Sequence, residues 1–138
     1  MGKGGFTLAT YTEHYGLHQW ESTDDFLRTD FNTDFAKIDA AIGGLLVFGT
    51  YTGNGAASRT IDLGFTPRAV YLCTQLGMTA DSSGSQYTYG GLFGAGHPLM
   101  HRANEAAEIV EGGFTVYDPG TNIFTNMDGY VFHYLAVK

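Results

Sequence analysis

A pair of glycines, Gly43 and Gly44, divides the chain into two parts whose residue patterns differ. Before the pair, apolar residues recur every three or four positions, which is the spacing of one face of an α-helix. After it, short apolar runs are separated by turns that contain glycine, which is typical of β-strands. Because glycine commonly ends a helix, the sequence predicts one helix that stops at Gly43 and a β-rich body after it.

The predicted helix covers residues 23–43. Ser22 or Thr23 can cap its start, and Asp24 and Asp25 lie in the first turn, where the helix dipole favours anions. Its apolar side chains form one narrow stripe with heptad spacing: Phe31, Phe35, Ile38, Ile42 and Leu45. Such a stripe can pack on the β domain of its own chain, join copies of the chain, or dock into a partner. These alternatives stay open at this point.

The part that follows is predicted to be an antiparallel β-sandwich over residues 45–138. Twenty glycines and a charged fraction of only 15% favour many turns and few solvated helices. Strands spaced in this way and joined by glycine turns are typical of a sandwich or barrel. They are expected up to Tyr51, around Ile61, over residues 69–74, on both sides of Gly112 and after Gly129.

The last predicted strand is apolar on both faces. One face carries Tyr130, Phe132, Tyr134 and Ala136, and the other carries Val131, His133, Leu135 and Val137. A strand at the end of a small sandwich needs only one buried face. The second apolar face therefore predicts a covering element or a neighbouring subunit.

The stretch from Gly77 to Glu108 has the least regular pattern and is too long for a plain connector, so it is predicted to form functional loops with one strand near Tyr89. Its mixture of Tyr, Ser, Gly and Asn is the composition that adaptable recognition loops use. The candidate binding residues in it are Tyr87, Tyr89, His97, His101, Arg102 and Asn104.

Charge and composition argue against several classes of function. The net charge is −7 and the seven Lys and Arg residues are scattered, so there is no basic stripe for nucleic acid. The same negative net charge argues against adhesion to anionic membranes. No apolar run is long enough to insert into a bilayer.

The candidate catalytic motifs are weak. His97 and His101 are four positions apart, but Pro98 follows the first and the Glu of a zinc protease is missing. Cys73, the only cysteine, sits in an alternating segment and is expected to be a core thiol. The sequence therefore predicts no enzyme, no metal site and no cofactor.

Several motifs resemble a known group of proteins. "YGLHQWESTDDFLRTDFNTDFAKID" resembles an N-terminal module of tail appendage proteins from bacteriophages and phage-derived particles. "GTYTGNG", "IDLGFTPRAVYL", "GGFTV" and "NMDGYVFHYLAVK" resemble the C-terminal domain of such proteins. The stretch from Gly77 to Glu108 has no counterpart in this resemblance.

The resemblance implies a homotrimeric tail fibre or receptor-binding protein on the virion tail, made in the bacterial host cytoplasm, with a lectin-like tip. Residues 1–22 would be an extended arm attached to tail or baseplate proteins through Tyr15, Leu17 and Trp20. The helical stripe would be a coiled-coil trimer seam, and the loops of the tip would bind a host cell-surface glycan.

Two alternatives belong to other classes of protein. The chain could be a purely structural tail or baseplate component that binds no receptor. It could also be a depolymerase that cleaves a surface polysaccharide, which would need two carboxylates facing each other across a cleft. The acids of the helix lie on one element rather than across a cleft.

Overall fold

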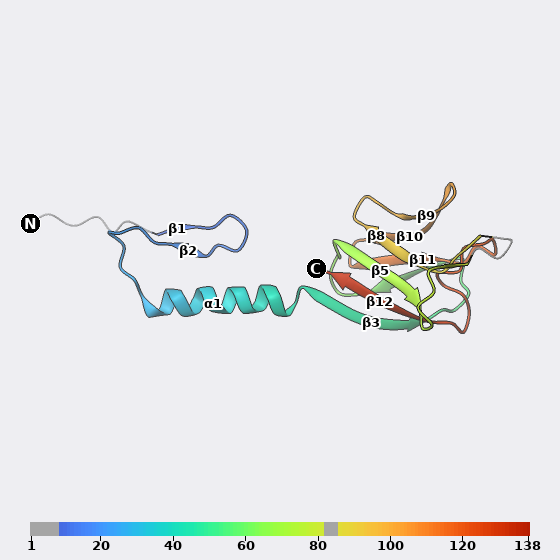
Figure 1. The fold of residues 1–138 in the computed structure, drawn as a ribbon, viewed down its shortest axis with the longest axis horizontal. Coiled ribbons are helices and arrows are strands. Elements are labelled where there is room, and N and C mark those ends of the chain that lie inside the picture. The colour runs from blue at the N-terminus through green and yellow to red at the C-terminus, as the bar shows by residue number, and fades with distance from the viewer. Residues whose placement is uncertain (1–8, 82–85) are drawn as a thin grey trace, which may run out of the picture. The chain divides into compact units, whose positions relative to one another are not determined.

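The computed structural model describes residues 9–81 and 86–138, and the chain divides after Leu45 into two compact units (Figure 1). The protein is mainly β, with one helix in the N-terminal unit and several antiparallel sheets. None of the sheets in the described ranges closes into a barrel. The predicted mainly β character with one N-terminal helix is confirmed. In the same ranges, no helix combines the length and hydropathy that crossing a membrane would require.

The described part of the predicted extended arm folds back on itself. Strands β1 (Thr10–Tyr11) and β2 (His18–Gln19) pair as an antiparallel hairpin. The side chain of Thr12 accepts a hydrogen bond from the Leu17 backbone N–H (2.9 Å), which closes the turn. Gly16 has φ +58°, a left-handed conformation that suits glycine. Residues 1–8 of the predicted arm lie outside the described ranges.

The helix α1 spans Arg28–Gly43, so its predicted end is right and its predicted start at residue 23 is wrong. The Asp24 carboxylate accepts a hydrogen bond from the Glu21 backbone N–H (2.7 Å), and the Asp24 N–H donates to the Glu21 carbonyl (3.0 Å). The expected capping residues therefore build a separate turn. Leu27 takes the N-cap position without a side-chain hydrogen bond.

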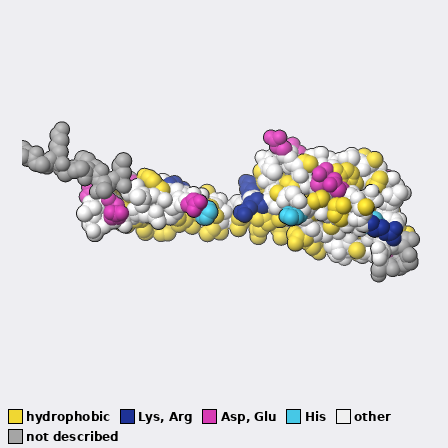
Figure 2. Space-filling model, turned by 90° about the horizontal axis from the view of Figure 1, so that it is seen from above, with side chains coloured by type: hydrophobic (Ala, Val, Ile, Leu, Met, Phe, Trp, Pro, Cys, Tyr) yellow, Lys and Arg dark blue, Asp and Glu magenta, His cyan; other side chains and the backbone are white. Residues whose placement is uncertain are grey.

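The apolar stripe of α1 lies on the surface of the N-terminal unit. Phe35 is 55% exposed and Ile42 is 71% exposed, while the polar Asp34 is buried. Figure 2 shows hydrophobic side chains gathered on the surface of this unit. The remaining predicted seam residues, Phe31, Ile38 and Leu45, are also exposed.

The second unit, here called the β domain, contains two four-stranded sheets in which every strand pair is antiparallel. One sheet has the order β4 (Ser58–Asp62), β11 (Gly113–Tyr117), β10 (Asn104–Val110), β9 (Leu99–His101). The other has the order β3 (Leu46–Thr52), β12 (Val131–Val137), β5 (Ala69–Thr74), β8 (Gly91–Gly94). A separate pair joins β6 (Ala80–Asp81) and β7 (Tyr87–Thr88).

Both sheets contribute side chains to one core. The ring of Phe132 from β12 stacks on Tyr51 from β3, with 5.0 Å between ring centroids. Phe114, from β11 of the other sheet, meets Tyr51 edge-on at 6.2 Å, and both Phe side chains are fully buried. Each such burial contributes roughly 1.5–3 kcal/mol, so this contact between the sheets is a main source of stability.

Two predictions about the β domain need correction. The stretch from Gly77 to Glu108 was expected to be loops with one strand, but it holds strands β6 to β9 and the start of β10. Its glycine-rich pieces are short hairpins, which a search for long alternating runs misses. Cys73 is partly exposed rather than a core thiol, because the alternation of β5 places its neighbours Leu72 and Thr74 inside.

Candidate functional site

Four aromatic side chains form a cluster in the β domain, here called the aromatic patch: Tyr87, Tyr89, Phe124 and Tyr130. Phe124 lies at the centre, with its ring centroid 5.5 Å from that of Tyr87 and 5.7 Å from that of Tyr89. Tyr89 in turn stacks near Tyr130, at 6.5 Å and an interplanar angle of 19°. Tyr130 is 44% exposed, so the patch reaches the surface.

Backbone hydrogen bonds join the two segments that carry the patch. The Phe124 N–H donates to the Thr88 carbonyl (2.8 Å), and the Thr88 N–H donates to the Asn122 carbonyl (2.9 Å). The Tyr89 N–H donates to the Thr79 carbonyl (2.8 Å). These bonds fix the backbones of Tyr89 and Phe124 relative to each other.

Two buried polar residues anchor the segment that follows Phe124. The Thr125 hydroxyl donates to the Ala106 carbonyl (2.6 Å) and accepts a bond from the Tyr117 N–H (2.8 Å). The Asn126 amide donates to the Asn54 side chain (2.7 Å). Because both anchors are fully buried and their hydrogen bonds are satisfied, the aromatic patch is held in place before any ligand arrives.

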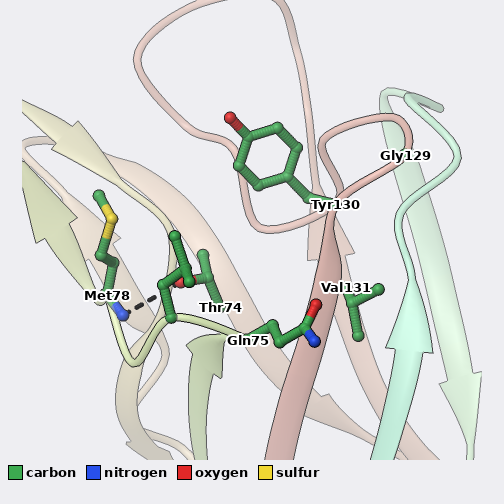
Figure 3. A pocket seen from close by; sticks show the side chains of 7 residues that line it. Thr74, Gln75, Met78, Gly129, Tyr130 and Val131 are labelled. Atoms are coloured by element: carbon green, nitrogen blue, oxygen red, sulfur yellow. Dashed lines mark hydrogen bonds between the residues drawn. The ribbon is translucent and has the colours of Figure 1, made fainter.

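A pocket of about 340 Å³ lies on the Tyr130 side of the patch (Figure 3). The Thr74 hydroxyl accepts a hydrogen bond from the Met78 N–H (3.0 Å), the dashed line in Figure 3, which holds the turn that forms one wall. Tyr130 stands on the other side of the pocket from Met78 in this view. The pocket is lined by Thr74, Gln75, Leu76, Met78, Gly129, Tyr130 and Val131.

A second pocket, of about 360 Å³, lies on the Tyr87 side of the patch. His101 is buried there, and its Nδ1 lies 2.9 Å from the Thr88 hydroxyl. The exposed Arg102 adopts φ +56° in the turn after β9 and is one of the residues that line this pocket. The pocket is lined by Ala80, Asp81, Gln86, Tyr87, Thr88, Met100, His101 and Arg102.

The patch and both pockets lie at one end of the β domain. Strand β3 begins at Leu46, which pairs with Val137, and ends at Thr52, which pairs with Val131. Tyr130 immediately precedes Val131, so the patch lies at the end where β3 finishes. We call this the loop end, and the end at Leu46 the entry end.

The structure brings most of the predicted binding residues together at the loop end. Tyr87, His101 and Arg102 line one pocket, and Tyr89 belongs to the patch beside it. Asn104 is exposed and pairs with His101 across the β9–β10 turn.

His97 lies apart from these residues. Its N–H donates to the Gly94 carbonyl (2.9 Å), and Gly94 pairs with Ala69 at the entry end. In the chain, β8 lies between Tyr89 and His97, and β9 lies between His97 and Arg102.

Phe124 and Tyr130 are functional candidates that the sequence analysis missed. The sequence analysis places Tyr130 on one of the two apolar faces of the last strand, and Phe124 lies in a segment without periodicity. Their role comes from contacts with residues about forty positions away in the chain. The periodicity of neighbouring residues does not reveal such contacts.

Desolvation raises the pKa of the Tyr89 phenol, and the neighbouring Tyr130, Asp81 and Tyr87 raise it further. The Tyr89 hydroxyl therefore stays protonated at neutral pH and can both donate and accept a hydrogen bond. Within the described ranges, no three His, Cys, Asp or Glu side chains come close enough to hold a metal ion.

The N-terminal unit carries a second candidate site, where the hairpin lies on α1. The His18 backbone N–H donates to Oδ2 of Asp34 (2.8 Å), and the His18 ring Nδ1 lies 2.9 Å from Oδ1 of the same carboxylate. The Lys37 ammonium donates to the Gly16 carbonyl. Burial by itself would raise the pKa of Asp34, but the hydrogen bonds from His18 and the charge of Lys37 hold it below its ordinary value.

These contacts form an apolar groove of about 210 Å³ between the hairpin and the helix. Two of the three predicted attachment residues, Leu17 and Trp20, line it, whereas Tyr15 is exposed in the hairpin turn. Three predicted seam residues line the same groove: Phe31, Phe35 and Ile38. The predicted attachment and seam residues therefore share one surface.

Comparison of the chain with known protein families, with curated proteins and with solved structures found no match.

Proposed function

We propose that this chain is a tail fibre or receptor-binding protein of a bacteriophage or phage-derived particle. In this proposal the N-terminal unit attaches it to tail or baseplate proteins. The β domain is an antiparallel sandwich, resembling a lectin-like tip, that binds a host cell-surface glycan. The motifs that resemble phage tail appendage proteins support the attachment, and the loop end supports the binding.

The observation that carries the proposal is the aromatic patch with a pocket on each side. Aromatic faces bind apolar surface, and nearby hydroxyl, amide and guanidinium groups fix orientation through hydrogen bonds. A sugar ring offers both surfaces, an apolar C–H face and a rim of hydroxyls. Tyr87 and Tyr130 would contact the apolar face of the sugar, and Arg102 would donate hydrogen bonds to its hydroxyls.

Assembly of three copies through the helical stripe would complete the proposed function. The stripe is exposed in the single chain, and its side chains would each contribute roughly 1.5–3 kcal/mol if fully covered. Three linked copies of a weak site also gain avidity on a repetitive cell surface, by a factor of about 10²–10⁴. Each individual glycan contact can then be weak.

The test is binding of the fluorescently labelled full chain to host cells. Tyr89→Ala with Tyr130→Ala removes half of the patch and is expected to abolish binding. His97→Ala is the matched control, because His97 lies at the entry end and its loss is expected to leave binding unchanged. Unaltered binding by the double variant would refute glycan recognition at the loop end.

A purely structural tail component is the second candidate, and the groove lined by Leu17 and Trp20 favours it. Under this alternative the chain binds tail proteins, Trp20→Ala weakens that binding, and no host cells are bound at all. Measuring both kinds of binding with the same protein separates the two functions.

A further inference from the structure

Arg102 occupies a backbone conformation that glycine usually adopts. In the described ranges, a positive φ occurs at nine glycines, at Asn122 and at Arg102, whose φ is +56°. Asparagine tolerates this conformation, whereas a long side chain such as that of arginine is strained in it. A residue kept in a strained conformation points to a role for its side chain.

The strain lies in the two-residue turn between β9 and β10. His101 pairs with Asn104, which leaves Arg102 and Ala103 as the loop. Only the first of these two has a positive φ, the pattern of a type II′ turn, and such a turn has glycine at that position. Glycine at residue 102 would remove the strain, so the arginine side chain is what distinguishes this position.

Arg102 lines the pocket on the Tyr87 side of the aromatic patch, and its guanidinium has no partner within the protein. In the part of the chain that the structure describes, no hydrogen bond, ion pair or ring contact holds it. Arg59 differs, because its guanidinium donates to the Thr52 carbonyl (2.7 Å) and lies over the Tyr51 ring. The Arg102 guanidinium is therefore available to a ligand.

The turn that carries Arg102 is fixed relative to the aromatic patch. The buried His101 precedes it, and the His101 Nδ1 lies 2.9 Å from the Thr88 hydroxyl. The Thr88 N–H in turn donates to the Asn122 carbonyl (2.9 Å). Arg102 and the neighbouring Tyr87 therefore lie on connected segments before a ligand arrives, which lowers the entropy lost on binding.

A guanidinium is suited to one chemical class of ligand. Its planar fork of N–H groups matches a carboxylate or a phosphate, with two parallel hydrogen bonds and opposite charge. The hydroxyls of a neutral sugar accept hydrogen bonds but leave the positive charge without a counterion.

An acidic side chain also lines this pocket. Asp81 belongs to β6, and its charge acts on the Tyr89 phenol in the patch, whereas Arg102 belongs to the turn after β9. Two opposite charges on separate elements orient a ligand that has a single anionic group. That group faces Arg102 and avoids Asp81.

We propose that Arg102 makes the loop end specific for acidic glycans, by binding a carboxylate or phosphate group of a sugar that lies on the aromatic patch. This inference rests on the proposed function and deepens it, because it names the class of glycan and the residue that selects it. The strain at Arg102 then has a reason, since the turn places a guanidinium at the pocket.

The test compares the purified surface polysaccharide of the host with two neutralised forms of it. Chemical reduction of the carboxyl groups removes the charge of uronic acids, and hydrofluoric acid removes phosphate. The full-length chain is expected to bind the native polymer about tenfold or more tightly than the form that lacks the recognised group. The form that is bound weakly identifies the source of the charge.

Substitutions of Arg102 separate the side chain from the strain. Arg102→Ala removes the guanidinium, keeps the β carbon, and is expected to bind the native and neutralised polymers equally. Arg102→Gly should lose the preference too. Since it also relieves the strain, it should raise the calorimetric unfolding midpoint of the β domain by roughly 2–8 °C.

Arg68→Ala is the matched control. It removes the same charge from the same domain, but the Arg68 N–H donates to the Val137 carbonyl (2.8 Å), which places this residue at the entry end. The preference for the native polymer should survive this substitution.

The outcomes separate this inference from the proposed function. Tight binding of all three polymers by the wild-type chain would overturn the specificity for acidic glycans and leave glycan recognition standing. A preference that survives Arg102→Ala would overturn the assignment to Arg102, and a midpoint lowered by Arg102→Gly would contradict the strain. Failure to bind either the native polymer or host cells would refute the proposed function, and this inference with it.

Discussion

The two units of the chain hold their aromatic side chains in opposite ways. In the β domain, Phe114 and Phe132 are fully buried between two sheets. In the N-terminal unit, Phe26 is 64% exposed and Phe35 is 55% exposed, although they belong to a chain of ring contacts that starts at Tyr11. Since apolar burial is the main favourable term in folding, the β domain contains its own stability, whereas the N-terminal unit gains its full stability only when covered.

The largest expected effect comes from deleting a core ring. Phe132→Ala should lower the free energy of unfolding of the β domain by about 3–5 kcal/mol, because the ring is fully buried and stacks on Tyr51. Phe35→Ala removes the same atoms from an exposed position and should leave unfolding of the β domain unchanged. Urea titrations followed by hydrogen exchange of the β12 amides measure both.

The single tryptophan sharpens that comparison, since Trp20 lies in the N-terminal unit and its fluorescence follows that unit alone. Phe35→Ala should alter the Trp20 fluorescence transition while leaving the hydrogen-exchange transition of the β12 amides unchanged. Equal losses in the β domain from both substitutions would contradict the difference drawn between the two units.

The next effect in size concerns the anchor of the aromatic patch. Thr125→Val keeps the shape but leaves the Tyr117 N–H and the Ala106 carbonyl without their hydroxyl partner. Buried polar groups left unpaired cost about 1–3 kcal/mol, which the same urea titration should detect. Thr121→Val, at an exposed position of the same loop, is the control and should be neutral.

The sequence could predict those elements whose signal is local. The strand predicted over residues 69–74 matches the bounds of β5, and Gly43 ends α1 as expected. Both predictions succeed because strand alternation and helix ends depend on residues that are neighbours in the sequence. The start of α1 was missed because Ser22 to Asp25 can cap a helix or close a turn, and the bond between Asp24 and Glu21 selects the turn.

The candidate site was predictable only in part, for a related reason. Tyr87, Tyr89, His101 and Arg102 could be found by composition, since they share one glycine-rich stretch. Phe124 joins them through a pairing between Thr88 and Ile123 that no local pattern encodes. His97 was grouped with them because it is near in sequence, although β8 carries the chain to the other end of the domain before His97.

A smaller and more local effect is expected where the hairpin meets the helix. The pKa of Asp34 is lower in the folded protein than its ordinary value of 3.8, so the carboxylate stabilises the N-terminal unit above that pH and the contribution is lost as pH falls through the lower value. Trp20 fluorescence should therefore change as the pH falls below 3.8 and through the lower pKa of Asp34 in the folded protein. Asp34→Asn should shift the neutral-pH signal and remove this pH dependence.

The control for this change is Asp39→Asn, which alters an exposed acid on the same helix and should keep the wild-type pH profile. If Asp34→Asn and Asp39→Asn gave the same profile, the bonds from His18 to Asp34 would not be what holds the hairpin on α1.

The smallest effect tests where the helix of the N-terminal unit begins. Thr23→Ala should change the stability of that unit by less than about 0.5 kcal/mol, as at an ordinary surface position, because α1 starts at Arg28 and Leu27 occupies the N-cap. If Thr23 were the cap, the same substitution would cost about 1 kcal/mol. Asp24→Ala should cost more than Thr23→Ala, since it removes the bond to the Glu21 N–H. Thermal unfolding monitored by Trp20 fluorescence distinguishes the two starts, and a larger loss at Thr23 than at Asp24 would place the helix start at the earlier position.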